Sequence, residues 1–400
     1  MIAPDIGKSF SFGDSTTYLN HGAFGVAPKE VLADRMRWLR KIERSPGAFV
    51  AYAFRPAWNQ TAARVAQRFC VRPDDLALIE NVTDGINAVL RSMTFQPGDE
   101  IVMTSVAYGS VRIMAEHIAR RQGAAVVEAR LGFSNPDPGQ IIDAIRSAIT
   151  PRTRLAILDH ITSSTALVLP IAEMTKACKE RGAAVLVDGA HVPGNIAFDI
   201  ESLGADWYVA NLHKWYFAPR GCGFLWAARD RQAGLVPAVL SWDIGRKFPH
   251  PFEWTGTRDA STWLSLPAAF KFMDRFGEAD VRAHNHALLR QGMALIEDRW
   301  GVRARTPDSM IGSMALLPLP DGMPYSAEEA GRLKLQKDLW DHFGIEASMS
   351  FAHEDRNWVR ISAQIYNKLR DYEALASAIL TMRSPDALRH MPRSRRSEKQ

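Results

Sequence analysis

The feature that most limits the possible folds of this chain is an alternation of short apolar runs with helix-like stretches between residues 100 and 228. The runs are β-branched or aliphatic on both faces, as is typical of strands covered by helices. Six runs are predicted strands: Glu100–Val106, Ala124–Leu131, Arg154–Ile161, Ala183–Ala190, Trp207–Leu212 and Gly223–Ala228. The intervening segments Ser110–Gly123 and Ile171–Gly182 are amphipathic and end on glycine, which predicts helices. Such an alternation predicts an α/β fold with a mostly parallel sheet.

The sequence changes character after about Asp243. Residues Gly245–Thr262 are rich in Gly, Pro and Thr and predict a long ordered loop, of a length that usually serves function or links domains. Helical patterns dominate beyond it, with predicted strands in Gly312–Pro320 and Trp358–Ile365. A chain of 400 residues suits a large domain and a smaller one. We therefore expect four parts, namely an N-terminal segment 1–30, a large domain 31–250, a small α+β domain 251–385 and a basic disordered tail 386–400.

Composition and charge favour an ordinary globular enzyme over a membrane or nucleic-acid protein. Hydrophobic residues make up 46% of the chain, yet there is no signal-peptide core and no run of eighteen apolar residues, so we expect a cytoplasmic protein without membrane contact. The cysteines Cys70, Cys178 and Cys222 lack metal-ligand spacing, which predicts no metal site and suits a reducing compartment. The net charge is +5, but the dense basic cluster Arg389–Gln400 is interpreted as a terminal tail and not as a nucleic-acid arm.

Two polar residues follow predicted strands, where ligands bind in an open parallel sheet. Asp188 ends the strand in "VLVDGAH", and Lys214 follows the strand in "WYVANLHK". A lysine in a dry pocket has a lowered pKa and can attack a carbonyl group to form a Schiff base. Each residue alone is more often an ordinary turn aspartate or a solvated lysine.

A third element is "ENVTDGINAVLRSM", in which Thr83 or Asp84 is predicted to cap a helix that begins near Gly85. The free N–H groups of a helix N-terminus can bind a phosphate, although every helix offers such groups. The three elements together match the needs of pyridoxal phosphate. Its phosphate would lie on the helix end, Asp188 would pair with the protonated ring nitrogen, and Lys214 would hold the aldehyde.

The sequence resembles the class V aminotransferase family of fold-type I pyridoxal-phosphate enzymes, and within it the isopenicillin N epimerase-like proteins. The resemblance runs from Tyr18 to Leu375 and is carried by "VDGAHVPG", "LHKW", "PRGCGFLW", "WTGTRD" and "RISAQIYN" in this order. It implies pyridoxal 5'-phosphate as cofactor, an amino acid as substrate, and a homodimer with shared active sites.

The resemblance also assigns roles to individual residues. Lys214 would carry the cofactor and move the α-proton, and Asp188 would bind the ring nitrogen. Arg360 would bind the substrate α-carboxylate through a bidentate pair, with Asn20 and His21 of the N-terminal segment at the substrate entrance. The remaining implied cofactor-binding residues are Val82, Thr83, Asp84 and His213 at the phosphate, Tyr108 stacked on the ring, Thr162, Ser163 and His191 near the phenolic oxygen, and Thr257 reaching the phosphate of the neighbouring subunit.

Each assignment has an ordinary alternative: Tyr108 as core, Thr257 as a turn residue, Arg360 as an ion-pair partner and His191 as a structural histidine. The same residues also serve epimerisation, transamination and elimination. The sequence therefore predicts an enzyme acting at the α-carbon of an amino acid, epimerase-like, with a C–S lyase or aminotransferase as alternative and a non-catalytic binding protein as the alternative from another class. No cysteine follows Cys222, which disfavours the persulfide chemistry of related cysteine desulfurases.

Overall fold

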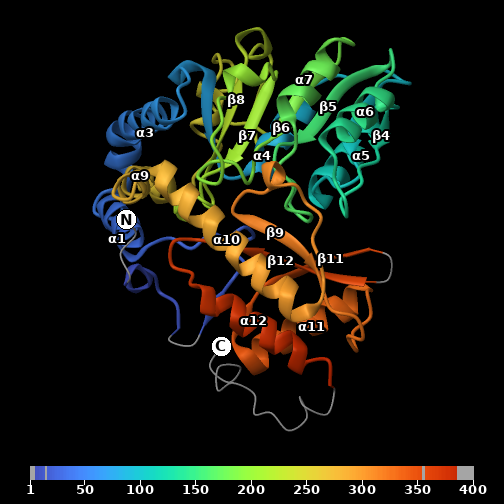
Figure 1. The fold of residues 1–400 in the computed structure, drawn as a ribbon. Coiled ribbons are helices and arrows are strands. Elements are labelled where there is room, and N and C mark those ends of the chain that lie inside the picture. The colour runs from blue at the N-terminus through green and yellow to red at the C-terminus, as the bar shows by residue number, and fades with distance from the viewer. Residues whose placement is uncertain (1–4, 14–15, 354–355, 385–400) are drawn as a thin grey trace.

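The computed structural model describes residues 5–13, 16–353 and 356–384, and its larger part is built on a seven-stranded sheet (Figure 1). The strand order is β2-β8-β7-β6-β5-β3-β4. The strands are β2 (Leu76–Ile79), β3 (Glu100–Thr104), β4 (Ala125–Ala129), β5 (Thr153–Asp159), β6 (Ala184–Asp188), β7 (Trp207–Asn211) and β8 (Gly223–Ala227). β8 runs antiparallel to both of its neighbours, and the other pairs are parallel. The six predicted strands and the mostly parallel α/β fold are confirmed, and β2 is a further strand.

Alternate residues of each central strand point into two separate cores, one on each face of the sheet. In β6, Val185 and Val187 belong to one core and Ala184 and Leu186 to the other. The second core is covered by α4 (Val82–Ser92) and α5 (Gly109–Gln122). The first core is covered by α1 (Lys29–Glu43), α3 (Phe54–Arg68), α6 (Pro138–Ala148), α7 (Ile171–Lys179), α8 (Ser261–Leu264) and α9 (Leu266–Asp274). Helices on both faces explain why these strands are apolar throughout.

The cap of α4 differs from the prediction that Thr83 or Asp84 would cap a helix near Gly85. The helix begins at Val82, and the residue before it, Asn81, is extended and accepts the N–H of Asp84 with its side-chain oxygen at 3.0 Å. The prediction was wrong because an Asn one residue before a helix reaches the N–H group of the first turn as well as Thr or Asp does.

The second part of the chain is a three-stranded antiparallel sheet with helices against it. It contains β9 (Met314–Pro318), β11 (Ser348–His353) and β12 (Arg356–Ser362) in the order β11-β12-β9, with α10 (Glu278–Trp300), α11 (Glu329–Phe343) and α12 (Leu369–Thr381). α10 runs diagonally from the helices beside the large sheet to the second sheet (Figure 1). The domain boundary near residue 250 stays a prediction, and the predicted tail 386–400 lies outside the described residues.

The N-terminal segment joins this second part. β1 (Thr17–Tyr18) pairs in parallel with β10 (Ile345–Glu346), and Leu19 is buried in the core between α10, α12 and the second sheet.

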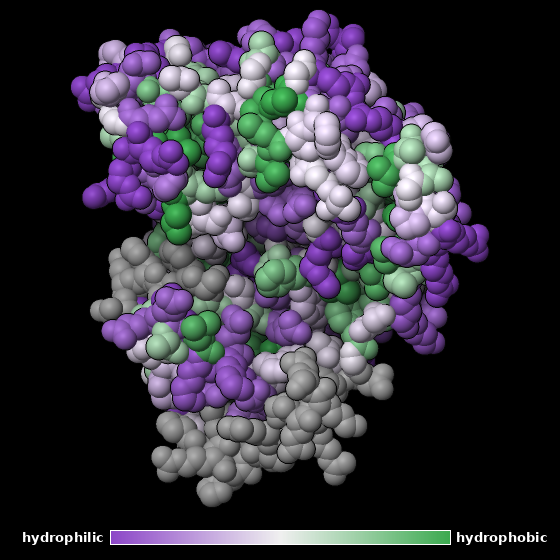
Figure 2. All heavy atoms as spheres, turned by 180° about the vertical axis from the view of Figure 1, so that it is seen from behind, coloured by the Kyte–Doolittle hydropathy of each residue, from purple (hydrophilic) through white to green (hydrophobic). Residues whose placement is uncertain are grey.

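On the face of the molecule opposite to the view of Figure 1, hydrophobic residues form patches that hydrophilic residues separate (Figure 2). Within the part of the chain that the structure describes, no helix has both the length and the apolar character needed to cross a membrane.

Candidate active site

A cavity of about 630 Å³ lies where the parallel strands β5, β6 and β7 end. Its lining comes from both parts of the chain: residues at these strand ends, the N-terminus of α4, the loop that follows β7, and Arg360 of β12. The strand ends converge here because the carboxyl ends of parallel strands lie on one edge of the sheet. A helix that follows such a strand begins at the same edge. Lys214, Asp188, His191, His213, Val82, Thr83, Tyr108, Ser163 and Arg360 all line it, as the sequence predicts for one site.

Lys214 is a half-buried lysine whose amine lines this cavity. Its Nζ lies 3.0 Å from Nε2 of His191. Burial lowers the pKa of Lys214 from its ordinary value to about 7, Asp188 opposes this shift, and the positive charge of Arg360 adds to it. At neutral pH a large fraction of the lysine is therefore the unprotonated, nucleophilic amine.

The backbone of Lys214 is held by the N-terminal segment. His21 is fully buried and donates from Nε2 to the carbonyl oxygen of Lys214 at 2.9 Å, while its Nδ1 accepts the hydroxyl of Tyr366 at 2.7 Å. A side chain at Gly25 would collide with the carbonyl oxygens of His213 and Lys214. Glycine at this position is therefore what allows the "LNHGAFG" segment to close on the lysine loop.

The pKa of Lys214 predicts how the cofactor-free protein takes up pyridoxal 5'-phosphate. Only the neutral amine attacks the aldehyde, so the rate of covalent uptake should rise with pH to a midpoint near 7 and then level off, instead of rising towards pH 10. Stopped-flow absorbance of apoenzyme mixed with cofactor measures this profile. Replacing Arg360 by methionine removes a positive charge that lowers the lysine pKa, so the midpoint should move to higher pH. A rate that still climbs steeply above pH 9 would contradict this assignment.

Asp188 ends β6 with its carboxyl group in the cavity. Its Oδ1 accepts the N–H of Ala190 at 2.9 Å. Burial raises the pKa of Asp188, whereas the Ala190 hydrogen bond and the charge of Lys214 lower it. The next strand, β5, ends on Asp159, a second buried carboxyl group of the cavity that the sequence prediction missed. The signal was present, because "LDH" follows its apolar run in the same way as "VDG" does.

The N-terminus of α4 forms one end of the cavity. Val82 and Thr83 line it, and Val82 donates its N–H to Oδ1 of Asn211 at 3.0 Å. Asn211, the last residue of β7, was also missed by the prediction. His213 is fixed by a contact of 2.9 Å between its Nδ1 and the carbonyl oxygen of Cys222, and burial lowers its pKa to about 4. The positive end of the helix dipole, the Thr83 hydroxyl and the His213 imidazole make this part of the cavity suited to a phosphate.

Arg360 belongs to β12 and lines the same cavity from the second part of the chain. Its guanidinium is buried and donates to the carbonyl oxygen of Ser163 and, at 3.2 Å, to Oδ1 of Asn20. Burial lowers the pKa of Arg360 to about 10, so the group remains a cation at neutral pH. A second arginine, Arg220, also lines the cavity and was not predicted. The cavity thus offers a buried, fork-shaped cation to a carboxylate.

Several predicted residues lie outside the lining of the cavity. The hydroxyl of Thr162 is buried in a turn with Thr165 and accepts the N–H of Leu167 at 2.8 Å. Asp84 accepts the N–H of Glu80 with its carboxylate. His21 contacts the backbone of Lys214, and Asn20 contacts the side chain of Arg360, but neither His21 nor Asn20 lines the cavity. The roles assigned to these side chains stay predictions, and the structure gives His21 and Asn20 a supporting position.

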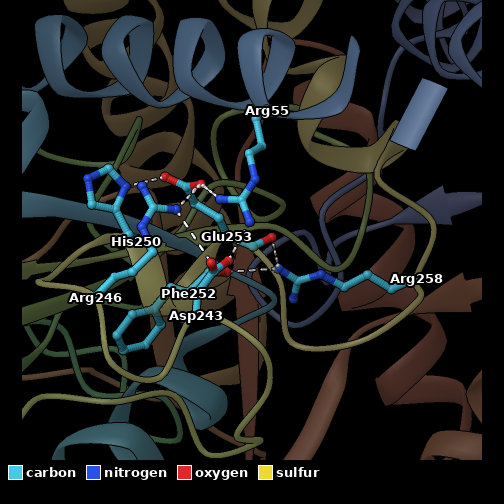
Figure 3. A network of polar contacts seen from close by, with 7 residues as sticks. All are labelled: Arg55, Asp243, Arg246, His250, Phe252, Glu253 and Arg258. Carbon is cyan, nitrogen blue, oxygen red and sulfur yellow. Dashed lines mark hydrogen bonds and ion pairs between the residues drawn. The ribbon is translucent and has the colours of Figure 1, made fainter. Parts of the chain in front are cut away.

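Thr257 is exposed and lies outside the cavity of its own chain. The segment before it is anchored to α3, where Arg55 donates to Asp243 and to Glu253, each at 2.7 Å (Figure 3). Arg258 donates to the carbonyl oxygen of Phe252 at 3.0 Å and lies over the ring of Trp263. The other residues drawn in Figure 3 are Arg246 and His250, which contact the same carboxylates. The loop is thus anchored on both sides of Thr257, which is exposed and outside the lining of the cavity.

These residues fit pyridoxal 5'-phosphate. One end of the cavity has anion-binding groups, Asp188 provides a carboxylate for a ring nitrogen, and Lys214 provides a neutral amine for the aldehyde. Among the described residues, the buried Nδ1 of His191 has no hydrogen-bond partner, which a bound polar group would supply. The described residues contain no cluster of three or more His, Cys, Asp or Glu side chains that could hold a metal ion.

Fold and site together define a fold-type I enzyme that depends on pyridoxal 5'-phosphate, as the sequence predicts. The Aminotransferase class-V family matches residues 17–375, and the chain belongs to this family. The predicted family and cofactor are thereby confirmed, and the non-catalytic alternative is not supported.

Curated relatives and solved structures agree with this assignment. The chain is 31% identical to an L-cysteine desulfhydrase of Arabidopsis thaliana, over 90% of this chain and 86% of the relative. It is 32% identical to the isopenicillin N epimerase of Amycolatopsis lactamdurans, over 93% of this chain and 96% of the relative. The fold is similar to that of the cystine C-S lyase C-DES, with a TM-score of 0.78 at 21% identity over 92% of this chain and 97% of that chain.

Proposed function

We propose that the protein removes the α-proton of an L-amino acid and then expels a sulfur group from its β-carbon, with L-cysteine or a related β-thio amino acid as substrate. For L-cysteine, the amino acid and water give sulfide, pyruvate and ammonia. The observation that supports this proposal is the pair of Lys214 and the buried His191, whose nitrogens lie 3.0 Å apart. One such acid–base pair suffices for elimination, because the group that accepts the α-proton can return a proton to the leaving sulfur. The relatives named L-cysteine desulfhydrase favour the same reaction.

Each residue of the site has a place in this reaction. Bound pyridoxal phosphate supplies an electron-poor ring that stabilises negative charge at the α-carbon. Arg360 binds the substrate carboxylate and so orients the α-proton towards Lys214. Lys214 accepts this proton because its pKa is near 7, and His191 holds the amine in place. Asp188 holds the ring nitrogen, and Val82, Thr83 and His213 hold the phosphate.

Epimerisation, the reaction of the relatives named isopenicillin N epimerase, is the second candidate. It requires a second acid on the opposite side of the α-carbon, and Tyr108 could supply it because its phenol lines the cavity and is 45% exposed. Tyr108→Phe should then abolish inversion at the α-carbon but leave elimination within about threefold of wild type.

One set of assays separates the two reactions. Wild type and Tyr108→Phe are incubated with L- and D-cysteine and other amino acids in deuterated water. Sulfide, keto acid, deuterium at Cα and inversion are then measured in the same samples. Sulfide and pyruvate in equal amounts support elimination, whereas deuterated D-amino acid without sulfide supports epimerisation. Keto acid without sulfide would contradict both and indicate transamination.

We also propose that the protein is a homodimer with shared active sites. Two neighbouring segments expose large apolar side chains: Tyr52 is 79% and Trp242 89% exposed. Arg55 and Asp243 tie these segments together through their ion pair. The same anchored loop presents Thr257 away from its own cavity, where it can reach the phosphate of a partner subunit. Exposed aromatic residues of this kind are typical of interfaces.

Trp242→Glu tests the dimer. The substitution places a charge at the centre of the apolar patch, so dimer dissociation should become at least about tenfold easier. Cofactor affinity should fall with it, since the monomer loses the partner's Thr257. Sedimentation velocity and cofactor titration over a range of protein concentrations measure both. Leu333→Glu, at an exposed apolar position on α11, is the matched control and should leave both unchanged. A wild-type monomer with full cofactor affinity would exclude the shared site.

The cytoplasmic location also remains a proposal. Its support is that Cys70, Cys178 and Cys222 are free thiols, with Cys178 and Cys222 buried. The division into domains 31–250 and 251–385 is likewise proposed on the change of sequence character after Asp243.

A further inference from the structure

Asp159 is a buried carboxyl group of the cavity to which the proposed reaction gives no role. It ends β5 as Asp188 ends β6, and the two residues are direct partners in the parallel ladder. Neighbouring strands lie about 4.8 Å apart, and paired residues of parallel strands point to the same face of the sheet. Both residues line the cavity. The two carboxyl groups therefore lie side by side and face the same space.

The surroundings of this pair contain little that could neutralise two charges. Asp159 accepts the hydroxyl of Thr104 at 3.3 Å and a backbone hydrogen bond from Tyr108, and Asp188 accepts the N–H of Ala190 at 2.9 Å. Among the described residues, neither carboxyl group has a cationic side chain within ion-pair distance. The cation that acts on the pair is Lys214, which acts on Asp188.

The charge state of the pair follows from burial. Asp159 is 4% and Asp188 5% exposed. Two adjacent buried carboxyl groups cannot both ionise, so they share one proton. Burial and the charge of Asp188 raise the pKa of Asp159 well above its ordinary value, although hydrogen bonds from Thr104 and the backbone of Tyr108 lower it. Burial also raises the pKa of Asp188, but the Ala190 hydrogen bond and the cation Lys214 favour its charged form, and no cation of the described residues acts in this way on Asp159. The imidazole of His160, the next residue, contacts the hydroxyl of Tyr208 at 3.1 Å. The proton therefore resides on Asp159.

We infer that Asp159 is a further positioning residue of the cofactor site: as a neutral carboxylic acid it donates a hydrogen bond to the Asp188 carboxylate and leaves the pair with one negative charge for the ring nitrogen. This role rests on the proposed pairing of Asp188 with that nitrogen. The hydrogen bond fixes the orientation of Asp188, and the single charge matches the single charge of a protonated ring nitrogen.

Two variants separate the hydrogen bond from the titratable group. Asp159→Asn keeps a neutral donor of the same size, so the dissociation constant for pyridoxal 5'-phosphate at pH 7 should stay within about threefold of wild type. Asp159→Leu removes the donor to a charged acceptor, so cofactor binding should weaken by at least about tenfold. Infrared spectra provide a signature that a merely structural role would not produce: wild type should show the C=O band of a buried carboxylic acid at pH 7, and Asp159→Asn should lose it.

Asp188→Asn distinguishes a failure of this inference from a failure of the proposed cofactor site. Asp188→Asn should weaken cofactor binding. It also removes the charge that raises the pKa of Asp159, so the carboxylic acid band of Asp159 should disappear at a lower pH than in wild type. Unchanged affinity in Asp188→Asn would overturn the pairing of Asp188 with the ring nitrogen. Weakened binding in Asp188→Asn, together with a carboxylic acid band that survives in Asp159→Asn, would overturn the role of Asp159 alone. The infrared comparison does not depend on whether Asp159→Leu folds.

Discussion

Replacing Lys214 by alanine should abolish covalent attachment of pyridoxal 5'-phosphate and lower turnover by at least about a thousandfold. Lys214 lines the cavity and its pKa is lowered to about 7, so the variant loses both the nucleophile and the base. The cofactor should still bind without a covalent bond, since the phosphate-binding residues and Asp188 remain. Mass spectrometry after borohydride reduction detects the covalent adduct, and single-turnover kinetics measures the loss of proton removal.

Lys176→Ala is the matched control for this experiment. Lys176 is exposed on α7 and its ammonium lies 3.9 Å from Glu180, so its removal should change neither attachment nor turnover. An adduct that persists in Lys214→Ala would place the covalent anchor on another lysine. Turnover within tenfold of wild type would remove Lys214 from the proton transfer.

Replacing Arg360 by methionine should lower kcat/KM by about a hundredfold, chiefly through a higher KM. The guanidinium is buried against the carbonyl oxygen of Ser163 and the side chain of Asn20, so it is already oriented before a carboxylate arrives. Arg360→Lys should recover only part of the loss, because an ammonium keeps the charge but loses the bidentate fork. The absorbance of the bound cofactor should remain that of wild type in both variants.

Arg356→Met, four residues earlier on β12, is the control because Arg356 donates to the carbonyl oxygen of Leu319 and does not line the cavity. Steady-state kinetics with the substrate found in the elimination assay provides the comparison. A fall in kcat at unchanged KM would show that Arg360 acts in the transition state and not in carboxylate binding.

The sequence was sufficient for β6, which ends on Asp188, and for β7, which precedes the Lys214 loop, because their apolar runs are long and a distinctive polar residue ends or follows each. It was not sufficient for β2, whose four residues are too few to show a period. The choice between Thr162 and Ser163 was open because both follow the same strand. The turn that binds the Thr162 hydroxyl to Leu167 turns it away from the cavity, and Ser163 lies on the cavity wall.

Contacts between distant residues set the other limits. Asp159 and Asp188 are 29 positions apart and meet only when β5 and β6 pair in register. The ion pair that anchors the Thr257 loop joins Arg55 to Asp243 across 188 positions, and the sequence around each residue does not predict its partner. The contact of His21 with Tyr366 spans 345 positions. Local patterns and the family resemblance therefore suggested candidate residues for the chemistry, whereas the contacts that hold these candidates required the fold.

The closure of the N-terminal segment on Lys214 has a consequence for biosynthesis. His21, which holds the lysine carbonyl, is itself held by Ser362 and Tyr366, and β1 pairs with residues 345–346. During synthesis residues 17–21 must therefore wait for residues 345–366 before the lysine loop acquires its support. A nascent chain that ends before Ile345 lacks this support even though all seven strands of the large sheet are complete. Assembly of the active site thus depends on residues that are synthesised after the whole large sheet.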